Sequence, residues 1–300
     1  MIVYRVSVDD EGSRCDRIVA RLLLVSFPTA QKLFRKGCVK VDGIRMRDGS
    51  VRVQRDACIE VYARESISDT SRWVESNSDP RELLYSKFDI VCDRDDYLVI
   101  NKASGIPVQG GSGIKFSVDS LLRQCDYHLV HRLDRDTSGL LVIAKNRASA
   151  RYLTCLFREH NVMKEYYAIV SGRITGDGCI QNFLCKGADG YVRVSQLGHG
   201  AITYYRAIYT DHKHSVLQLR PKTGRTHQLR VHCAEVLSAP IVGDRRYVIP
   251  TKIRQSSNTP LHLHASRIVL DGDEIVVSWP KYFHKTCPGM PSFQMTLSIM

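Results

Sequence analysis

The chain has 300 residues, 43% of them hydrophobic, which is enough to bury the core of one large domain or of a large and a small domain. No run of about 18 apolar residues occurs, and the N-terminal stretch lacks the basic start and apolar segment of a secretory signal, so we expect a cytosolic protein without a membrane span. The formal net charge of +12 favours a polyanionic partner, most commonly nucleic acid, over a surface that is basic only for solubility.

Two amphipathic helices are predicted near the N-terminus. The first runs from Cys15 to Leu24, where Ile18 and its apolar neighbours recur at helical spacing. The second follows Pro28, with Thr29 as its N-cap and Gly37 at its end. Each helix carries basic side chains outside its apolar face.

A short β-hairpin is predicted directly after the second helix. Val39 and Val41 alternate with lysine as in a half-buried strand, and Asp42-Gly43 is a turn signal. The segment from residue 29 to residue 55 contains eight basic residues against two acidic ones. Two helices and a hairpin therefore share one basic face.

This arrangement, and the run QKLFRKGCVKVDG in particular, resembles an S4 RNA-binding domain. A rigid helix–strand corner with clustered cations can contact RNA phosphates without reading bases. The expected contacts are Lys32, Arg35, Lys36 and Lys40. The alternative interpretation is a charged, solvated face.

The composition changes between Glu65 and Pro80. The stretch ESISDTSRWVESNSDP is rich in serine, aspartate and asparagine and has no hydrophobic period, which is typical of a linker. We therefore predict an S4-like domain over residues 1–64, a linker over 65–85 and a second domain over 86–300.

The second domain is predicted to open with two strands between Ile90 and Asn101, joined by an acidic turn. The glycine-rich stretch NKASGIPVQGGSG follows. It contains neither G-x-G-x-x-G nor G-K-[ST], so we interpret it as a flexible loop and not as a phosphate-binding loop.

Reactive groups gather in HRLDRDTSG, residues 131–139, just before the apolar strand LLVIA. The final three residues, TSG, are predicted to form the turn into that strand, which leaves the polar residues on a loop held by a rigid element. Arg132 and Arg135 flank Asp134 and favour its ionised form, so this carboxylate is a candidate nucleophile or base. A plain ion pair with a neighbouring arginine is the alternative.

Two later segments place polar groups on or beside predicted strands. KEYYAIV, residues 164–170, reads as a strand with Tyr166 and Ala168 on one face and Tyr167 and Ile169 on the other. Farther along, LRPKTGRTHQLRVHC reads as a strand end, a Thr-Gly turn and a helix that carries a histidine and an arginine.

Metal sites find little support in the sequence. The ten cysteines include no CxxC pair, so we expect reduced thiols that are partly buried. His262 and His264 face the same side of a predicted strand, but no third ligand stands at a recognisable spacing. Histidines in the core or beside RNA fit this pattern better.

Taken in order, HRLDRDTSGLL, KEYYAIV, PKTGRTHQLRVH and LHLHA resemble the motifs of the RluA-type pseudouridine synthases, over nearly all of residues 88–280. With the S4-like domain in front, the layout is similar to that of the large-subunit ribosomal enzymes C and D of this family. One departure is Ala103, where the family often has proline. The resemblance implies an α+β catalytic domain on a large, mostly antiparallel sheet, and conversion of uridine to pseudouridine in RNA without cofactor or metal.

The resemblance also implies residue roles. Asp134 matches the catalytic carboxylate, Arg132 the arginine that fills the space left by the flipped base, and Tyr166 the tyrosine that stacks on the uracil. Arg230, 96 positions after Asp134, matches the arginine that pairs with the carboxylate, and Arg225 is its rival. Further RNA contacts are expected from His131, Arg225, Thr226 and His227, the histidines chiefly by orienting their neighbours.

The substrate is expected to be RNA of the large ribosomal subunit, and the enzyme to be a monomer. Two other function classes stay open at this point. A ribosome-assembly factor would bind ribosomal RNA without reacting, although it would have no need of Asp134, Tyr166 and Arg230 together. A glycosidase would cleave the same bond, but a single carboxylate without an acid partner argues against it.

Overall fold

The computed structural model describes residues 2–23, 27–62, 80–110, 114, 116–248 and 259–293. The chain divides into two compact units, which are Met1–Lys87 with Pro107–Tyr127, and Phe88–Ile106 with His128–Met300. Most of the predicted linker lies outside the described residues, but residues 80–85 are helical, as part of α3 (Pro80–Lys87). Within the described ranges, no helix is both long and apolar enough to cross a membrane.

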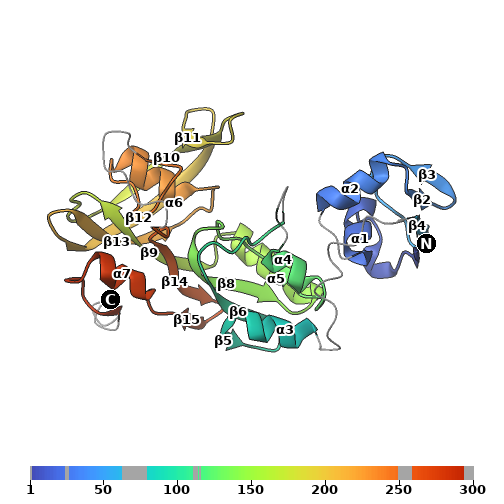
Figure 1. The fold of residues 1–300 in the computed structure, drawn as a ribbon, viewed down its shortest axis with the longest axis horizontal. Coiled ribbons are helices and arrows are strands. Elements are labelled where there is room, and N and C mark those ends of the chain that lie inside the picture. The colour runs from blue at the N-terminus through green and yellow to red at the C-terminus, as the bar shows by residue number, and fades with distance from the viewer. Residues whose placement is uncertain are drawn as a thin grey trace. The chain divides into compact units, whose positions relative to one another are not determined.

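The first unit contains a four-stranded antiparallel sheet with strand order β1-β4-β2-β3. Ile18, Phe34 and Ile59 are among the fully buried residues that join its first two helices and the sheet in one core. Besides α3, its elements in Figure 1 are β1 (Ile2–Arg5), a 3-10 turn (Val8–Asp10), α1 (Cys15–Leu22), α2 (Phe27–Arg35), β2 (Val39–Val41), β3 (Ile44–Met46), β4 (Cys58–Val61) and α4 (Val118–Leu122).

The predicted helices are present with shifted ends. α1 ends at Leu22, and Leu24 lies outside the described residues. α2 begins at Phe27, so Thr29 lies inside the helix and its predicted N-cap role is wrong. The reason is that Pro28 is compatible with the first turn of a helix, where backbone N–H groups have no intrahelical acceptor.

The end of α2 and the hairpin agree with the prediction. Gly37 adopts a positive φ of 67°, and its N–H donates to the carbonyl of Phe34. Asp42 and Gly43, with φ of 50° and 77°, join β2 to β3. Positive φ at both central residues is what a type I′ hairpin turn requires.

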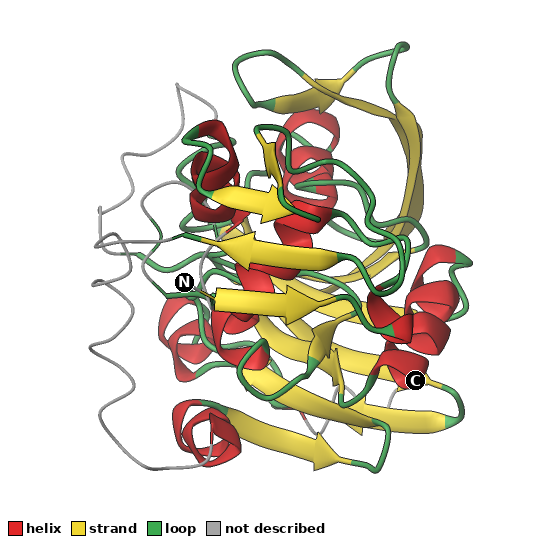
Figure 2. Cartoon of the chain, turned by 90° about the vertical axis from the view of Figure 1, so that its right-hand side faces the viewer, coloured by secondary structure: helices red, strands yellow, loops and turns green. Residues whose placement is uncertain are grey.

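The second unit is built on an 11-stranded sheet. Nine strands follow the order β11-β10-β12-β13-β9-β14-β8-β6-β5, while β15 pairs with β14 and β7 pairs with β8. All pairs are antiparallel except β14 with β8, which confirms the predicted large, mostly antiparallel sheet. Figures 1 and 2 show its long strands and accompanying helices. The strands are β5 (Asp89–Asp93), β6 (Tyr97–Lys102), β7 (His128–Leu129), β8 (Ser138–Ala144), β9 (Met163–Ser171), β10 (Asp177–Lys186), β11 (Val192–Val194), β12 (His199–Thr210), β13 (His214–Pro221), β14 (Leu263–Leu270) and β15 (Asp273–Val276).

Helices cover the sheet through separate apolar clusters. α5 (Arg147–Arg158) contributes Leu153 to a cluster with β6, β8 and β14. α6 (Gln228–Val231) continues into a π-helical turn (His232–Val236) and packs on the β9 face that carries Tyr166 and Ala168. α7 (Lys281–Thr286) packs on the opposite face, with Tyr167. The predicted division of the β9 side chains is therefore confirmed.

Two neighbouring strands approach unusually closely where the polar loop enters β8. Gly139 has a φ of 108°, and a Cβ atom there would lie 2.2 Å from the carbonyl oxygen of Ala265 in β14. Only glycine fits this conformation and this space. The predicted turn Thr137–Gly139 is displaced: Ser138 and Gly139 already belong to β8, and the turn is closed by Thr137 N–H donating to the carbonyl of Asp134.

Candidate active site

His131 anchors the start of the loop of residues 130–137. The imidazole Nε2 accepts the backbone N–H of Val142 in β8 at 2.8 Å, and the ring stacks on Phe157 of α5 with centroids 4.3 Å apart. Burial lowers the pKa of His131 to about 3, so the ring is neutral and can accept this bond. Through these contacts His131 links the loop to β8 and α5.

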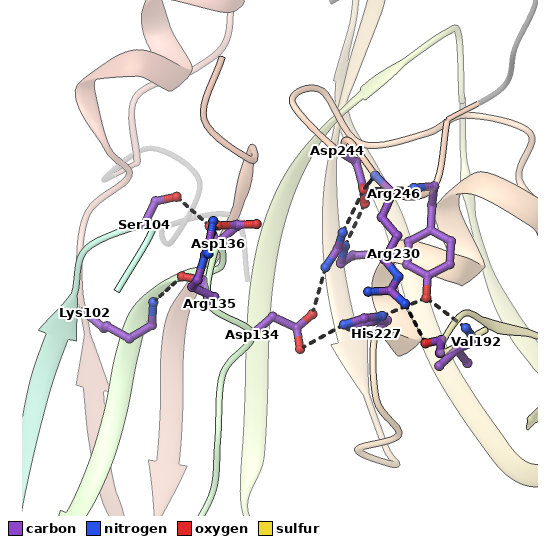
Figure 3. A network of polar contacts seen from close by, with 12 residues as sticks. Lys102, Ser104, Asp134, Arg135, Asp136, Val192, His227, Arg230, Asp244 and Arg246 are labelled. Atoms are coloured by element: carbon purple, nitrogen blue, oxygen red, sulfur yellow. Dashed lines mark hydrogen bonds and ion pairs between the residues drawn. The ribbon is translucent and has the colours of Figure 1, made fainter. Parts of the chain in front are cut away.

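Lys102 anchors the same loop from the other side. Its Nζ donates to the carbonyls of Ala103 and Ile106 at 2.9 and 3.0 Å. It also donates to the carbonyl of Arg135 at 2.9 Å (Figure 3). Burial lowers the pKa of Lys102 to about 8, although the charges of nearby aspartates oppose the shift. The loop that its composition marked as flexible is therefore tied to Arg135 and Asp136, through Lys102 Nζ, the Ser104 hydroxyl and the Gly105 N–H.

The loop presents Asp134 to a buried arginine. Asp134 Oδ2 accepts a hydrogen bond from Arg230 Nη1 at 3.4 Å, and Oδ1 lies 3.9 Å from His227 Nε2 (Figure 3). The Asp134 side chain is 19% exposed, against 7% for Arg230. The carboxylate is thus the accessible end of an otherwise buried ion pair.

Arg230 is held by a second carboxylate, that of Asp244. Arg230 Nε and Nη2 donate to Asp244 Oδ2 and Oδ1 at 2.7 and 2.8 Å, a bidentate pair with Asp244 fully buried. Burial alone would lower the pKa of Arg230, but the hydrogen bonds and charges of Asp244 and Asp134 outweigh it and raise this pKa. Asp244 therefore holds the guanidinium in place, and its Nη1 faces Asp134.

Tyr166 on β9 completes the surroundings of Asp134. Burial, and then the charge of Asp134, raise the pKa of Tyr166, so the phenol stays protonated at neutral pH. Its hydroxyl makes no hydrogen bond to any residue that the structure describes. The ring packs at the edge of the cluster formed by Ala168, Leu219 and Leu229.

The remaining predicted residues of this unit lie around the site or away from its centre. Arg132 and Thr226 are exposed. Arg225 is also exposed, and its Nε donates to the carbonyl of Gly200 at 3.0 Å. Arg230, and not Arg225, is therefore the arginine that contacts Asp134.

The predicted phosphate contacts belong to the first unit. Lys32, Arg35 and Lys36 are exposed, and Lys40 is half-buried with its Nζ 5.1 Å from the ring centroid of Tyr62. Three of the four cations are open to solvent.

The strand histidines have structural partners. His264 Nδ1 bonds Ser138 Oγ at 2.8 Å, and His262 bonds the carbonyl of Pro260 and the hydroxyl of Thr286. They are buried, which lowers the pKa of both rings. They belong to the core, one of the two settings expected for them.

A group with metal-compatible spacing occurs elsewhere among the described residues, at Asp211, His214 and Cys287. Asp211 Oδ1 already accepts the N–H groups of Lys213 and His214, and burial raises the pKa of the Cys287 thiol to about 11. A turn and a core thiol account for this group without an ion.

Two residues that matter to the geometry escaped the sequence analysis. Asp244 lies in IVGDRRY, a segment without a recognised motif, and a buried carboxylate there cannot be told from a turn residue. Lys102 ends a continuous apolar strand, YLVINK, where a lysine that enters the core is a weak but visible signal.

Residues 96–235 match the family model described as RNA pseudouridylate synthase. The chain is 33% identical over 329 aligned positions to RNA pseudouridine synthase 4, mitochondrial, of Arabidopsis thaliana, covering 90% of this chain and 69% of that protein. It is 34% identical to ribosomal large subunit pseudouridine synthase C of Vibrio cholerae, covering 82% and 80%. The chain belongs to the RNA pseudouridine synthase family.

Solved structures agree with this assignment. Human RNA pseudouridylate synthase domain containing 4 aligns with a TM-score of 0.57 and 27% identity, over 68% of this chain and 92% of that one. The chain is therefore an RNA pseudouridine synthase, an isomerase whose substrate is RNA, as the RluA-type motifs indicated.

Proposed function

We propose that this pseudouridine synthase modifies uridines of large-subunit ribosomal RNA, with Asp134 as its catalytic carboxylate. The observation that carries the proposal is the placement of Asp134, accessible itself but paired with Arg230, a buried cation. The ribosomal target is supported by relatives named ribosomal large subunit pseudouridine synthase C. An S4-like first unit, monomeric state and a cytosolic location complete the proposal.

The reaction sets clear requirements for such a site. The bond between uracil N1 and ribose C1′ breaks, the base turns, a bond forms between C5 and C1′, and the proton leaves C5 while N1 takes one up. An ionised carboxylate is needed to attack the sugar or the base, or to remove a ribose proton, and Asp134 is proposed for that step. Arg230, which contacts Oδ2, orients the carboxylate for that step.

The uridine must first leave its stack, which costs a few kcal/mol. Arg132, exposed beside Asp134, is proposed to occupy the space of the flipped base, because a planar guanidinium both stacks and donates hydrogen bonds. Tyr166 is proposed to stack on the uracil as a neutral phenol. His131 is proposed to position the loop through Val142 and Phe157.

Asp134→Asn tests the assignment, because asparagine is nearly isosteric and removes only the charge. We expect RNA binding within about a factor of three of wild type and no pseudouridine in position-by-position mapping of ribosomal RNA. Pseudouridine formed at the wild-type rate would exclude Asp134 as the reacting group. Release of free uracil by the wild-type protein would instead indicate a glycosidase.

A further inference from the structure

His227 lies next to the Asp134 carboxylate oxygen that Arg230 does not contact. Its Nε2 lies 3.9 Å from Oδ1, while Arg230 contacts Oδ2. His227 precedes α6 in the left-handed conformation, with φ 54° and ψ 17°. A residue with a Cβ adopts this conformation only where its surroundings hold it. The backbone therefore directs this ring toward Asp134.

Tyr247 fixes the other side of the ring. Its hydroxyl oxygen lies 2.7 Å from His227 Nδ1 and accepts the backbone N–H of Val192 at 3.1 Å. Tyr247 is buried, and its hydroxyl makes no other hydrogen bond to the described residues. Its single proton must go to Nδ1, because the reverse arrangement would leave a buried O–H donor without an acceptor.

This count of donors and acceptors determines the histidine tautomer. A neutral imidazole that accepts at Nδ1 carries its proton on Nε2, and that N–H points to Asp134 Oδ1. We propose that His227 is a positioning residue for Asp134, held by Tyr247 as the neutral Nε2–H tautomer that orients Oδ1 without neutralising it. The inference rests on the proposed catalytic role of Asp134.

The charges around His227 are compatible with a neutral ring. Burial lowers the pKa of His227, the Asp134 carboxylate opposes this shift, and Arg230 and Arg246 add to it. Asp244 also opposes it, more weakly than Asp134. A neutral donor at 3.9 Å leaves Oδ1 available to react, whereas an imidazolium would compete for its lone pairs.

The tautomer can be measured without any catalytic assay. In the full chain labelled with 15N-histidine, the His227 spin system is identified by its loss in His227→Gln. At pH 7.5 we expect a protonated Nε2 and a bare Nδ1. A proton on Nδ1, or an imidazolium at this pH, would overturn the inference, even if the protein forms pseudouridine normally.

Kinetics test the positioning role. Tyr247→Phe removes the proton donated to Nδ1, so the pKa of His227 should rise and the acid limb of the kcat/KM profile should move up by roughly 0.5–1 pH unit. Tyr191→Phe is the matched control, because this ring lies 6.1 Å from that of Tyr247 and its hydroxyl contacts no described residue. Identical profiles for Tyr247→Phe and wild type would contradict the proposal.

A second pair of variants covers the case in which Tyr247→Phe fails to fold. His227→Gln and His227→Leu have similar volume and share the cost of the left-handed backbone, but only glutamine offers an N–H of comparable reach. We expect glutamine to keep at least tenfold more kcat than leucine at equal KM. Equal kcat values would assign His227 a purely structural role, and an inactive wild type would refute the proposed function itself.

Discussion

Replacement of Asp244 by asparagine should destabilise the second unit and abolish activity. Asp244 accepts four hydrogen bonds, two from Arg230 and one each from the backbone N–H groups of Arg246 and Tyr247. The asparagine carbonyl oxygen can accept the three hydrogen bonds that now end at Oδ1. The amide NH2 then replaces Oδ2 opposite the Arg230 Nε–H, so that two donors face each other without an acceptor. The buried cation also loses the charge that balances it. Removal of one partner from a buried pair costs about 3–5 kcal/mol.

The assay follows urea unfolding through tryptophan fluorescence. In a Trp73→Phe background, Trp279, buried in the second unit, is the single reporter. Asp244→Asn should move the midpoint by about 1.5–3 M, given a slope of about 1.5–2 kcal/mol/M. The double variant Asp244→Leu with Arg230→Met should recover most of the stability, since apolar side chains replace a buried ion pair at little cost. It should remain inactive, because the cation that holds Asp134 Oδ2 is gone.

Two results would refute this reasoning. A loss below about 1 kcal/mol for Asp244→Asn would place the pair in the range of solvated surface ion pairs, against its burial. Full activity in the double variant would show that Asp134 needs neither carboxylate nor guanidinium behind it. Asp189→Asn is the control, because that aspartate pairs with Arg193 at the surface and should change the midpoint little.

Three further predictions follow from the loop and from the basic cluster. Gly139→Ala should cost at least about 3 kcal/mol in the same assay, because its Cβ would overlap β14, and an unchanged midpoint would contradict the close approach. The pKa of Lys102 is about 8 in the folded state and 10.5 in the unfolded chain, so only the unfolded chain keeps the proton between these values. The stability of the wild type relative to Lys102→Met should therefore rise with pH from about 8 to 10.5, and a difference that stays constant would refute the shift. Joint replacement of Lys32, Arg35 and Lys36 by alanine should lower the slope of log affinity against log salt by about 2–3 at unchanged kcat, and an unchanged slope would exclude these phosphate contacts.

The sequence was informative where a local pattern determines the structure. Alternation on β9 separated Tyr166 from Tyr167 correctly, and Asp42-Gly43 specified a hairpin turn that needs two positive φ values. The start of α2 was wrong because Thr29 was taken as the cap, whereas proline is tolerated inside the first helical turn and the helix already begins at Phe27. Periodicity therefore located the elements more reliably than it located their ends.

The site was only partly visible because its contacts join distant segments. Motif resemblance paired Asp134 with Arg230, but Asp244 fixes that arginine from a segment with no motif. His131 was expected among the RNA contacts chiefly as a residue that orients its neighbours, and only the fold reveals Val142 and Phe157 as its partners. Lys102 was missed because its acceptors are backbone carbonyls, which no side-chain pattern encodes.

The asymmetry of the donors around Asp134 explains how one carboxylate can be both fixed and reactive. Oδ2 faces a guanidinium that Asp244 holds rigidly, so rotation of the carboxylate would break an ion pair. Oδ1 faces a neutral imidazole at 3.9 Å, beyond hydrogen-bond distance. Two cations would stabilise the ground state of the carboxylate as much as any transition state and so would not accelerate the reaction. One cation and one neutral donor fix the direction of Oδ1 while leaving its lone pairs to the nucleotide.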